Sequence, residues 1–256
     1  MRNLRCVILA GGLGTRLRES TEFKPKPMIE IDSNPIIWHI MKSYSYYGVK
    51  NFVICTGYMR EFITNYFLHY NSVNQDIEID LDRNEVKYLG EPEKWNVLVS
   101  NTGLQTMTGG RIHKIKKYIN EENFLCTYGD AVSDVNIKDL YDFHLEHGKI
   151  ATMMVVRQPS RFGVVELDNK SNVENFREKP IVDGWVNAGY FIFSKKIFNF
   201  LTDDSVLEQD PLTKLAGLGE LKAFKHDGFW QAMDTFREQQ ILSNLIKIGD
   251  APWIKW

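Results

Sequence analysis

The chain has 256 residues, of which 43% are apolar and 12% aromatic, and 31 basic against 33 acidic residues leave a formal net charge of −2. This length and composition can bury a full core, which excludes intrinsic disorder, and the balanced charge argues against a protein that coats nucleic acid or binds membranes through basic residues. The apolar runs are far shorter than the ~18 to 20 residues that span a bilayer, so we expect no membrane or nucleic-acid partner.

Three apolar runs, each with one cysteine, end abruptly in turn residues. Cys6 lies before Gly11-Gly12, Cys55 before Thr56-Gly57, and Cys126 before Gly129-Asp130. Continuous apolar runs are typical of parallel strands that helices cover on both faces. Three cysteines are too few for a disulfide framework, and none has a second Cys or His at metal-ligand spacing. We therefore expect buried free thiols and a cytoplasmic location.

A helix is predicted between the first two strands. Apolar residues recur at 36, 37, 40, 41, 44 and 47, Pro35 precedes them, and Gly48 follows. A strand, a helix and a strand in this order form a βαβ unit, which places the turns after the strands at one edge of the sheet. Open α/β sheets bind ligands at this carboxyl edge, so we expect the site there.

The later part of the chain carries shorter signals. From about residue 75 to 101 the apolar residues alternate or form short stretches, which predicts an added antiparallel region. Further strand-like runs lie at 152–156, 163–167 and 190–193, and a final helix is predicted from about 235 to 248. Without repeats or a linker, residues 1–256 indicate one mixed α/β domain. Its inserted part, about 68–100, would suit subunit contacts.

A glycine-rich segment follows the first strand, and it reads Leu9-Ala10-Gly11-Gly12-Leu13-Gly14-Thr15-Arg16-Leu17. Three glycines in four positions allow backbone N–H groups to approach a phosphate, and the guanidinium of Arg16 can donate two charge-assisted hydrogen bonds to it. The segment lacks the third glycine of the dinucleotide fingerprint and the Gly-Lys-Ser/Thr of a Walker A loop. It therefore predicts a polyphosphate loop of another kind, with a plain tight turn as the alternative.

The next segment is Lys24-Pro25-Lys26-Pro27-Met28. Its two prolines stiffen an extended stretch, so the ammonium of Lys26 can be held near the glycine loop. The alternative is an ordinary solvated lysine.

Together these two segments resemble the signature of the sugar-phosphate nucleotidylyltransferases, and the resemblance extends along essentially the whole chain. Met107-Thr-Gly-Gly-Arg111 and Phe229-Trp-Gln-Ala-Met-Asp-Thr235 are similar to the branch of glucose-1-phosphate cytidylyltransferases. The resemblance implies a Rossmann-like, mixed but mainly parallel sheet flanked by helices. It further implies that CTP and α-D-glucose 1-phosphate, or a close sugar 1-phosphate, give a CDP-sugar and pyrophosphate with Mg²⁺ as cofactor. It also suggests a homo-oligomer, with a hexamer as the expected size.

The resemblance implies three catalytic residues, Arg16, Lys26 and Asp130. Arg16 and the glycine loop would bind the β and γ phosphates, and Lys26 the α-phosphate. Asp130 and Asp234 would hold Mg²⁺, which takes one or two protein carboxylates together with phosphate oxygens. Asp130 has an alternative role as a turn residue, and Asp234 as a helix cap, because Thr235-x-x-Glu238 is a capping box.

The nucleotide-binding set implied in this way is Leu9, Ala10, Gly11, Gly12, Leu13, Gly14, Thr15, Arg16, Lys26, Thr106, Arg111 and Gly129. Arg111, with Thr106 nearby, is expected to donate to O2 or N3 of cytosine, or merely to begin a helix. On the acceptor side, Lys179 would bind the sugar phosphate and Glu178 a sugar hydroxyl, with Asn187 and Gly189 beside them.

Two departures concern the sugar pocket, because Ala131 and Ala188 stand where the family pattern has glycine. Three rival functions remain open: a catalytically silent regulatory subunit of the same fold, a uridylyl- or thymidylyltransferase, and an NAD-dependent oxidoreductase. The broken glycine fingerprint disfavours the last of these.

Overall fold

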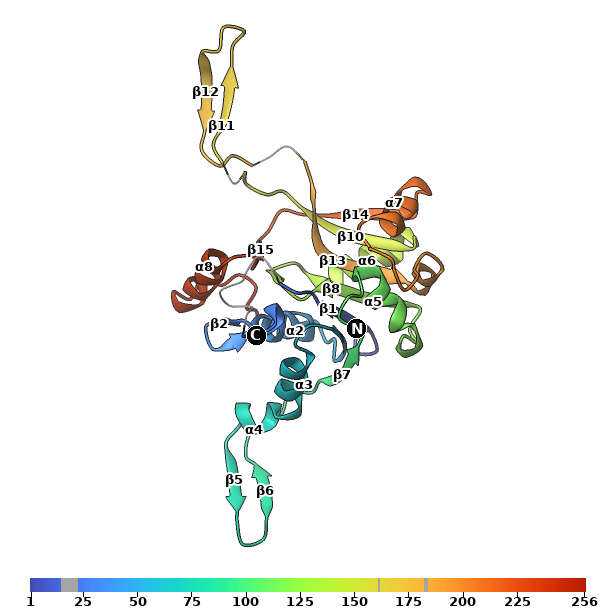
Figure 1. Ribbon diagram of the computed structural model, residues 1–256, viewed down its shortest axis with the longest axis vertical. Helices are drawn as coiled ribbons and strands as arrows, with labels where there is room; N and C mark the ends of the chain where they lie inside the picture. Colours follow the sequence, from blue (N-terminus) through green and yellow to red (C-terminus); the bar gives the residue numbers. More distant parts are fainter. Residues whose placement is uncertain (15–22, 161, 182–183) are drawn as a thin grey trace.

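The computed structural model describes residues 1–14, 23–160, 162–181 and 184–256. A seven-stranded sheet lies at its centre, in the order β14-β10-β13-β8-β1-β4-β7 (Figure 1). The strands are β1 (Arg5–Ala10), β4 (Asn51–Thr56), β7 (Asn96–Asn101), β8 (Asn123–Tyr128), β10 (Ala151–Val156), β13 (Val186–Ser194) and β14 (Leu221–His226). Only β13 runs antiparallel to its neighbours, so the prediction of a mixed, mainly parallel sheet is confirmed.

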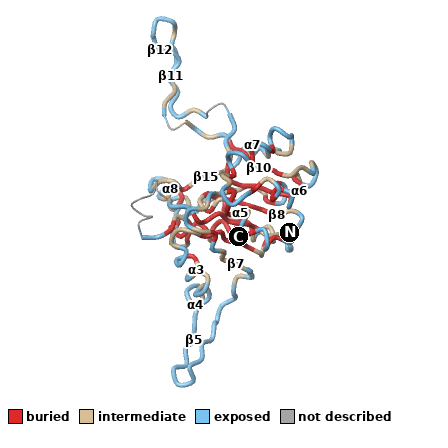
Figure 2. Tube along the Cα trace, turned by 45° about the vertical axis from the view of Figure 1, so that its right-hand side comes forward, coloured by how far each residue is buried: buried red, intermediate tan, exposed pale blue. Residues whose placement is uncertain are grey.

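Helices cover both faces of this sheet. The described helices are α2 (Ile36–Tyr46), α3 (Arg60–Leu68), α4 (Tyr70–Asn74), α5 (Thr108–Lys114), α6 (Ile137–His147), α7 (Asp210–Gly217) and α8 (Phe236–Lys247). Successive residues of β1 belong to different cores: Ile8 packs in the cluster of α2, and Val7 in the cluster of α5. The cysteine-bearing strands are therefore buried on both faces (Figure 2), and all three thiols are buried and free, as predicted.

Two hairpins project from opposite ends of the molecule (Figure 1). One pairs β5 (Ile77–Asp80) with β6 (Glu85–Tyr88), and the other pairs β11 (Val164–Leu167) with β12 (Val173–Arg177). The antiparallel prediction for residues 75–101 is confirmed for the first hairpin and wrong for β7, which pairs in parallel with β4. The apolar run of β7 is short, and such a run does not specify the direction of its partner.

None of the described helices combines the length and apolar character needed to cross a membrane.

The stability of the fold is expected to decrease below about pH 6.5, because His39 on α2 is buried as a neutral ring. Its Nε2 lies 3.2 Å from the carbonyl oxygen of Ile31, and its Nδ1 accepts from the indole of Trp253. Burial lowers the pKa of His39 to about 4, so between pH 6.5 and 4 the unfolded chain binds the extra proton. At pH 5 this costs about 2 kcal/mol of unfolding free energy.

Denaturant unfolding at pH 7 and pH 5 tests this expectation. His39→Gln should reduce the loss of stability between the two pH values by about 2 kcal/mol. The exposed His69 supplies the control, since His69→Gln should leave the pH dependence unchanged. An unchanged pH dependence in His39→Gln would show that His39 is not the group responsible.

Candidate active site

A cavity of about 270 Å³ lies at the carboxyl edge of the sheet, where β1 and β8 end. Segments distant in sequence line it together: Leu9, Ala10, Gly12, Gly14, Lys26, Pro27, Gly129, Asp130 and Asp234. Thr15 and Arg16, which were expected beside the phosphates, lie outside the described residues. The structure thus gathers the glycine loop, the lysine and both carboxylates in one place.

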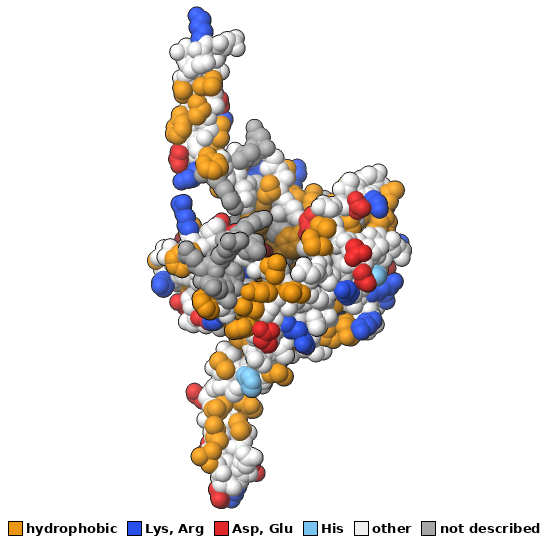
Figure 3. Space-filling model, viewed as in Figure 1, with side chains coloured by type: hydrophobic (Ala, Val, Ile, Leu, Met, Phe, Trp, Pro, Cys, Tyr) orange, Lys and Arg blue, Asp and Glu red, His pale blue; other side chains and the backbone are white. Residues whose placement is uncertain are grey.

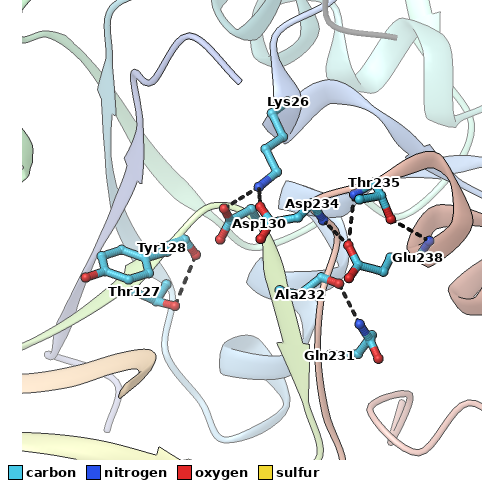
Figure 4. A network of polar contacts seen from close by, with 9 residues as sticks. All are labelled: Lys26, Thr127, Tyr128, Asp130, Gln231, Ala232, Asp234, Thr235 and Glu238. Atoms are coloured by element: carbon cyan, nitrogen blue, oxygen red, sulfur yellow. Dashed lines mark hydrogen bonds and ion pairs between the residues drawn. The ribbon is translucent and has the colours of Figure 1, made fainter. Parts of the chain in front are cut away.

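A short strand pair brings the two carboxylates together. Strand β9 (Ala131–Ser133) pairs antiparallel with β15 (Trp230–Ala232), and Ala131 lies opposite Ala232. One residue beyond this pairing, the backbone N–H of Met233 donates to the carbonyl oxygen of Asp130 at 2.8 Å. The ladder therefore places Asp130 and Asp234 side by side (Figure 4).

Lys26 forms ion pairs with both carboxylates. Its Nζ lies 2.6 Å from Oδ2 of Asp130 and 2.6 Å from Oδ1 of Asp234, and only 12% of its side chain is exposed. Burial by itself would lower the pKa of Lys26, but the two carboxylates outweigh it and raise the pKa. Lys26 is therefore a charged, enclosed group, and the alternative of a solvated lysine does not describe it.

The start of α8 fixes the backbone of Asp234. Thr235 is the N-cap residue of this helix, and Glu238 completes a capping box with it. Glu238 also accepts from the backbone N–H of Asp234 at 2.6 Å. Capping is thus done by Thr235 and Glu238, while the carboxylate of Asp234 is directed to Lys26 (Figure 4).

Gly129 allows the ends of β1 and β8 to approach each other. Its N–H donates to the carbonyl oxygen of Leu9 at 3.1 Å, and a Cβ atom there would lie 3.0 Å from that oxygen. Gly14 has a φ of +63°, in the left-handed region that favours glycine. Leu13, between the loop glycines, is 47% exposed.

Arg111 differs from expectation, because it is buried within α5 and has a relative exposure of 4%. Its Nη1 and Nη2 atoms donate to the carbonyl oxygens of Gly11, Thr56, Gly103 and Leu104 and to the hydroxyl of Thr102. These acceptors already use both Nη groups, so the arrangement does not offer the direct donation to a base that was expected. Arg111 instead ties the glycine loop, the end of β4 and residues 102–104 together.

Thr106 belongs to the same group of loops. Its hydroxyl donates to the carbonyl oxygen of Thr102 at 2.6 Å, and Lys114 donates to it at 2.9 Å. The segment expected to read the base is therefore held by its own hydrogen bonds.

The residues expected on the sugar side lie in two places. Lys179 and Asp234 both line a second cavity, of about 430 Å³, and Lys179 pairs with the exposed Glu178 at 3.1 Å. Asn187 and Gly189 lie on β13, where the side-chain oxygen of Asn187 accepts from the N–H of Gly189. The structure thus brings Lys179, but not Asn187, to a cavity that Asp234 shares.

Tyr128 and Glu208 form a polar link that the sequence did not predict. The hydroxyl of Tyr128 donates to Glu208 and accepts from Nδ2 of Asn187, while Thr108 donates to the other oxygen of Glu208 at 2.6 Å. Burial, with the nearby carboxylate of Glu208, raises the pKa of Tyr128. Tyr128 directly precedes Gly129-Asp130, which is a usable signal, whereas nothing in the sequence near Glu208 indicates its partner.

The two alanines that depart from the family pattern are buried rather than open to the cavities. Ala131 is 2% exposed and Ala188 is 1% exposed, and the carbonyl oxygen of Ala188 accepts from the indole of Trp230. Neither residue lines the two cavities described above.

The described residues contain no group of three or more His, Cys, Asp or Glu side chains that could hold a metal ion. Asp130 and Asp234 provide two carboxylates at an open cavity. Such a pair fits a hard divalent cation that takes further oxygen ligands from a bound phosphate.

A comparison with known families decides the identity. The nucleotidyl transferase family model matches residues 5–224. The chain belongs to this family. Glucose-1-phosphate cytidylyltransferase from Salmonella typhimurium is 46% identical to this nucleotidyltransferase over 99% of the chain and 100% of the relative. The relationship to the glucose-1-phosphate cytidylyltransferases predicted from the sequence is thus confirmed.

Solved structures agree with this assignment. HddC from Yersinia pseudotuberculosis has a TM-score of 0.69 and 26% identity, covering 95% of this nucleotidyltransferase and 99% of that chain. A UDP-glucose pyrophosphorylase complexed with UDP-glucose has a TM-score of 0.70 and 18% identity, covering 96% and 99%. The second likeness concerns the fold alone. The family match ends before Asp234, and the structure places that residue at the cavity.

Proposed function

We propose that this nucleotidyltransferase transfers the cytidylyl group of CTP to α-D-glucose 1-phosphate, forming CDP-glucose and releasing pyrophosphate, with Mg²⁺ as the divalent metal. The full-length identity to a glucose-1-phosphate cytidylyltransferase supports the choice of substrates. The observation that carries the proposal is the convergence of Lys26, Asp130 and Asp234 beside the glycine loop. Such a site neutralises phosphate charge, which is the main demand of this reaction.

The proposed reaction joins two anions. An oxygen of the sugar phosphate attacks the α-phosphorus of CTP, the bond to the β-phosphate breaks, and pyrophosphate leaves. The backbone N–H groups of the glycine loop and Arg16 hold the β and γ phosphates, Lys26 neutralises the α-phosphate, and Lys179 holds the sugar phosphate. The attacking phosphate is already anionic, so Glu178 accepts from a sugar hydroxyl and does not act as a base. Asp130 and Asp234 would hold a divalent cation, which would supply further charge neutralisation.

Arg111 takes a revised role in this proposal. Its guanidinium connects the glycine loop to residues 103 and 104, and we infer that it thereby shapes the part of the site that recognises cytosine. Backbone carbonyl oxygens accept from the N4 amino group, which cytosine has and uracil lacks. A base with a different arrangement of hydrogen-bond donors and acceptors leaves a buried donor or acceptor of the site without a partner, which weakens binding by ~1 to 3 kcal/mol.

Pyrophosphate release tests the proposed function. With glucose 1-phosphate present, kcat/KM for CTP should exceed that for UTP and dTTP by at least ~10-fold. Without a sugar 1-phosphate, CTP should give no pyrophosphate. Release from none of the nucleotides would indicate a silent regulatory subunit, and a preference for UTP or dTTP would contradict the cytidylyl assignment.

The proposal extends to assembly and location. We infer one functional domain over residues 1–256 that acts as a cytoplasmic homo-oligomer, with a hexamer as the expected size. The β5–β6 hairpin supports self-association, because apolar side chains gather on it in the open (Figure 3). They are Ile77, Ile79, Leu81, Val86, Tyr88 and Leu89, each at least 37% exposed. An exposed apolar strand pair of this kind is typical of an interaction surface.

Ile79→Asp is expected to dissociate the oligomer, because it places a charge in the centre of this apolar surface. The exposed Glu78 on the same strand supplies the control, and Glu78→Gln should leave the assembly intact. Light scattering coupled to gel filtration measures both. An unchanged mass for Ile79→Asp, or a monomeric wild type, would contradict the proposed subunit contact.

A further inference from the structure

Lys26 and the proposed metal share the same two carboxylates. The ammonium lies 2.6 Å from one oxygen of Asp130 and 2.6 Å from one oxygen of Asp234. Divalent ions such as Mg²⁺ approach carboxylate oxygens to about 2.1 Å. A cation bound to both of these oxygens would therefore lie close to the Lys26 nitrogen and meet the repulsion of its positive charge.

We propose that Lys26 holds the metal position closed in the nucleotide-free enzyme, and that nucleotide binding opens it by drawing the ammonium to the α-phosphate. This inference rests on the proposed function, since it takes Asp130 and Asp234 as the metal carboxylates. Lys26 then has two roles: it neutralises the carboxylate pair before substrate binds, and the phosphate afterwards.

The charge balance of the site explains why the two events depend on each other. Among the described residues that line the cavity, one ammonium and two carboxylates give a net charge of −1, and a divalent cation added beside an unmoved ammonium would meet its repulsion. A polyphosphate provides the negative charge that the displaced ammonium needs. Most of the Lys26 side chain is buried, so solvent water screens this competition only weakly.

Binding free energies are reciprocal, so a nucleotide that moves Lys26 raises metal affinity, and metal raises nucleotide affinity by the same factor. The enzyme would thereby avoid filling its metal position without a substrate to activate. Removing the ammonium should abolish this restraint.

Titration of the protein with Mn²⁺ alone, followed by electron paramagnetic resonance of the free ion, tests the inference without turnover. Lys26→Met should bind Mn²⁺ at least ~10-fold more tightly than the wild type, and Lys26→Arg, which keeps the charge, should bind as weakly as the wild type. The exposed Lys24, paired with Glu30, supplies the matched control, and Lys24→Met should not differ from the wild type. Adding Asp130→Asn to Lys26→Met should remove the tight binding.

Equal or weaker Mn²⁺ binding by Lys26→Met would overturn the inference. Circular dichroism verifies folding, and Lys26→Gln replaces the Met variant if that one does not fold. The titration contains no nucleotide, so a negative result would contradict this inference and not the proposed function. The proposed function is tested separately, by pyrophosphate release from CTP by the wild type.

Discussion

Asp130→Asn is expected to lower kcat by at least ~100-fold in the presence of Mg²⁺, the scale of losing one preorganised stabilising group. The substitution keeps the size of the side chain and removes one of the two charges beside Lys26. Asp234→Asn should have a similar effect, because β9 and β15 place both residues at the same cavity. Steady-state pyrophosphate release measures both variants.

The exposed Asp142 on α6, which pairs with Lys138, supplies a control for the loss of one carboxylate. Asp142→Asn should retain wild-type turnover. Chelation by EDTA should stop the wild-type reaction and Mg²⁺ should restore it. Near-normal activity of Asp130→Asn in Mg²⁺ would show that the two-carboxylate metal site is wrong.

Lys26→Met is expected to lower kcat by ~100-fold or more, because the change removes the positive charge proposed to neutralise the α-phosphate in the transition state. Lys26→Arg should recover part of the loss, since it restores the charge with a different geometry. Measurements at saturating CTP and glucose 1-phosphate separate this effect from substrate binding. An unchanged kcat in folded Lys26→Met would remove Lys26 from the chemistry.

Local sequence patterns were sufficient to predict the buried parallel strands and two of the helices. Continuous apolar runs ending in glycine defined β1, and Pro35 with Gly48 bounded α2. The capping box of Thr235 and Glu238 located the start of α8. The pairing of β7 was missed, because a short apolar run carries no information about the strand beside it.

The parts of the site that consist of residues close together in the sequence could be predicted. The glycine loop and Gly129-Asp130 could be placed at the edge of the sheet from strand ends alone. The placement of Asp130 and Asp234 at one cavity depends on a strand pair between distant segments, and only the resemblance indicated it. The burial of Arg111 was missed for the same reason: its acceptors lie on three segments that are distant in sequence, the glycine loop, the end of β4 and residues 102–104.

The pairing of β9 with β15 also determines when, during synthesis, all residues of the site are present. Both strands of the ladder must exist before Asp234 can reach Asp130, and β15 is the last strand of the chain. Until the ribosome has released this segment, β9 lacks the strand with which it pairs in the structure, whereas all seven strands of the central sheet precede β15 in the chain. The chain therefore receives its second carboxylate after all seven strands of the central sheet have been synthesised, and a nascent chain that ends before Asp234 lacks one of the two carboxylates of the cavity.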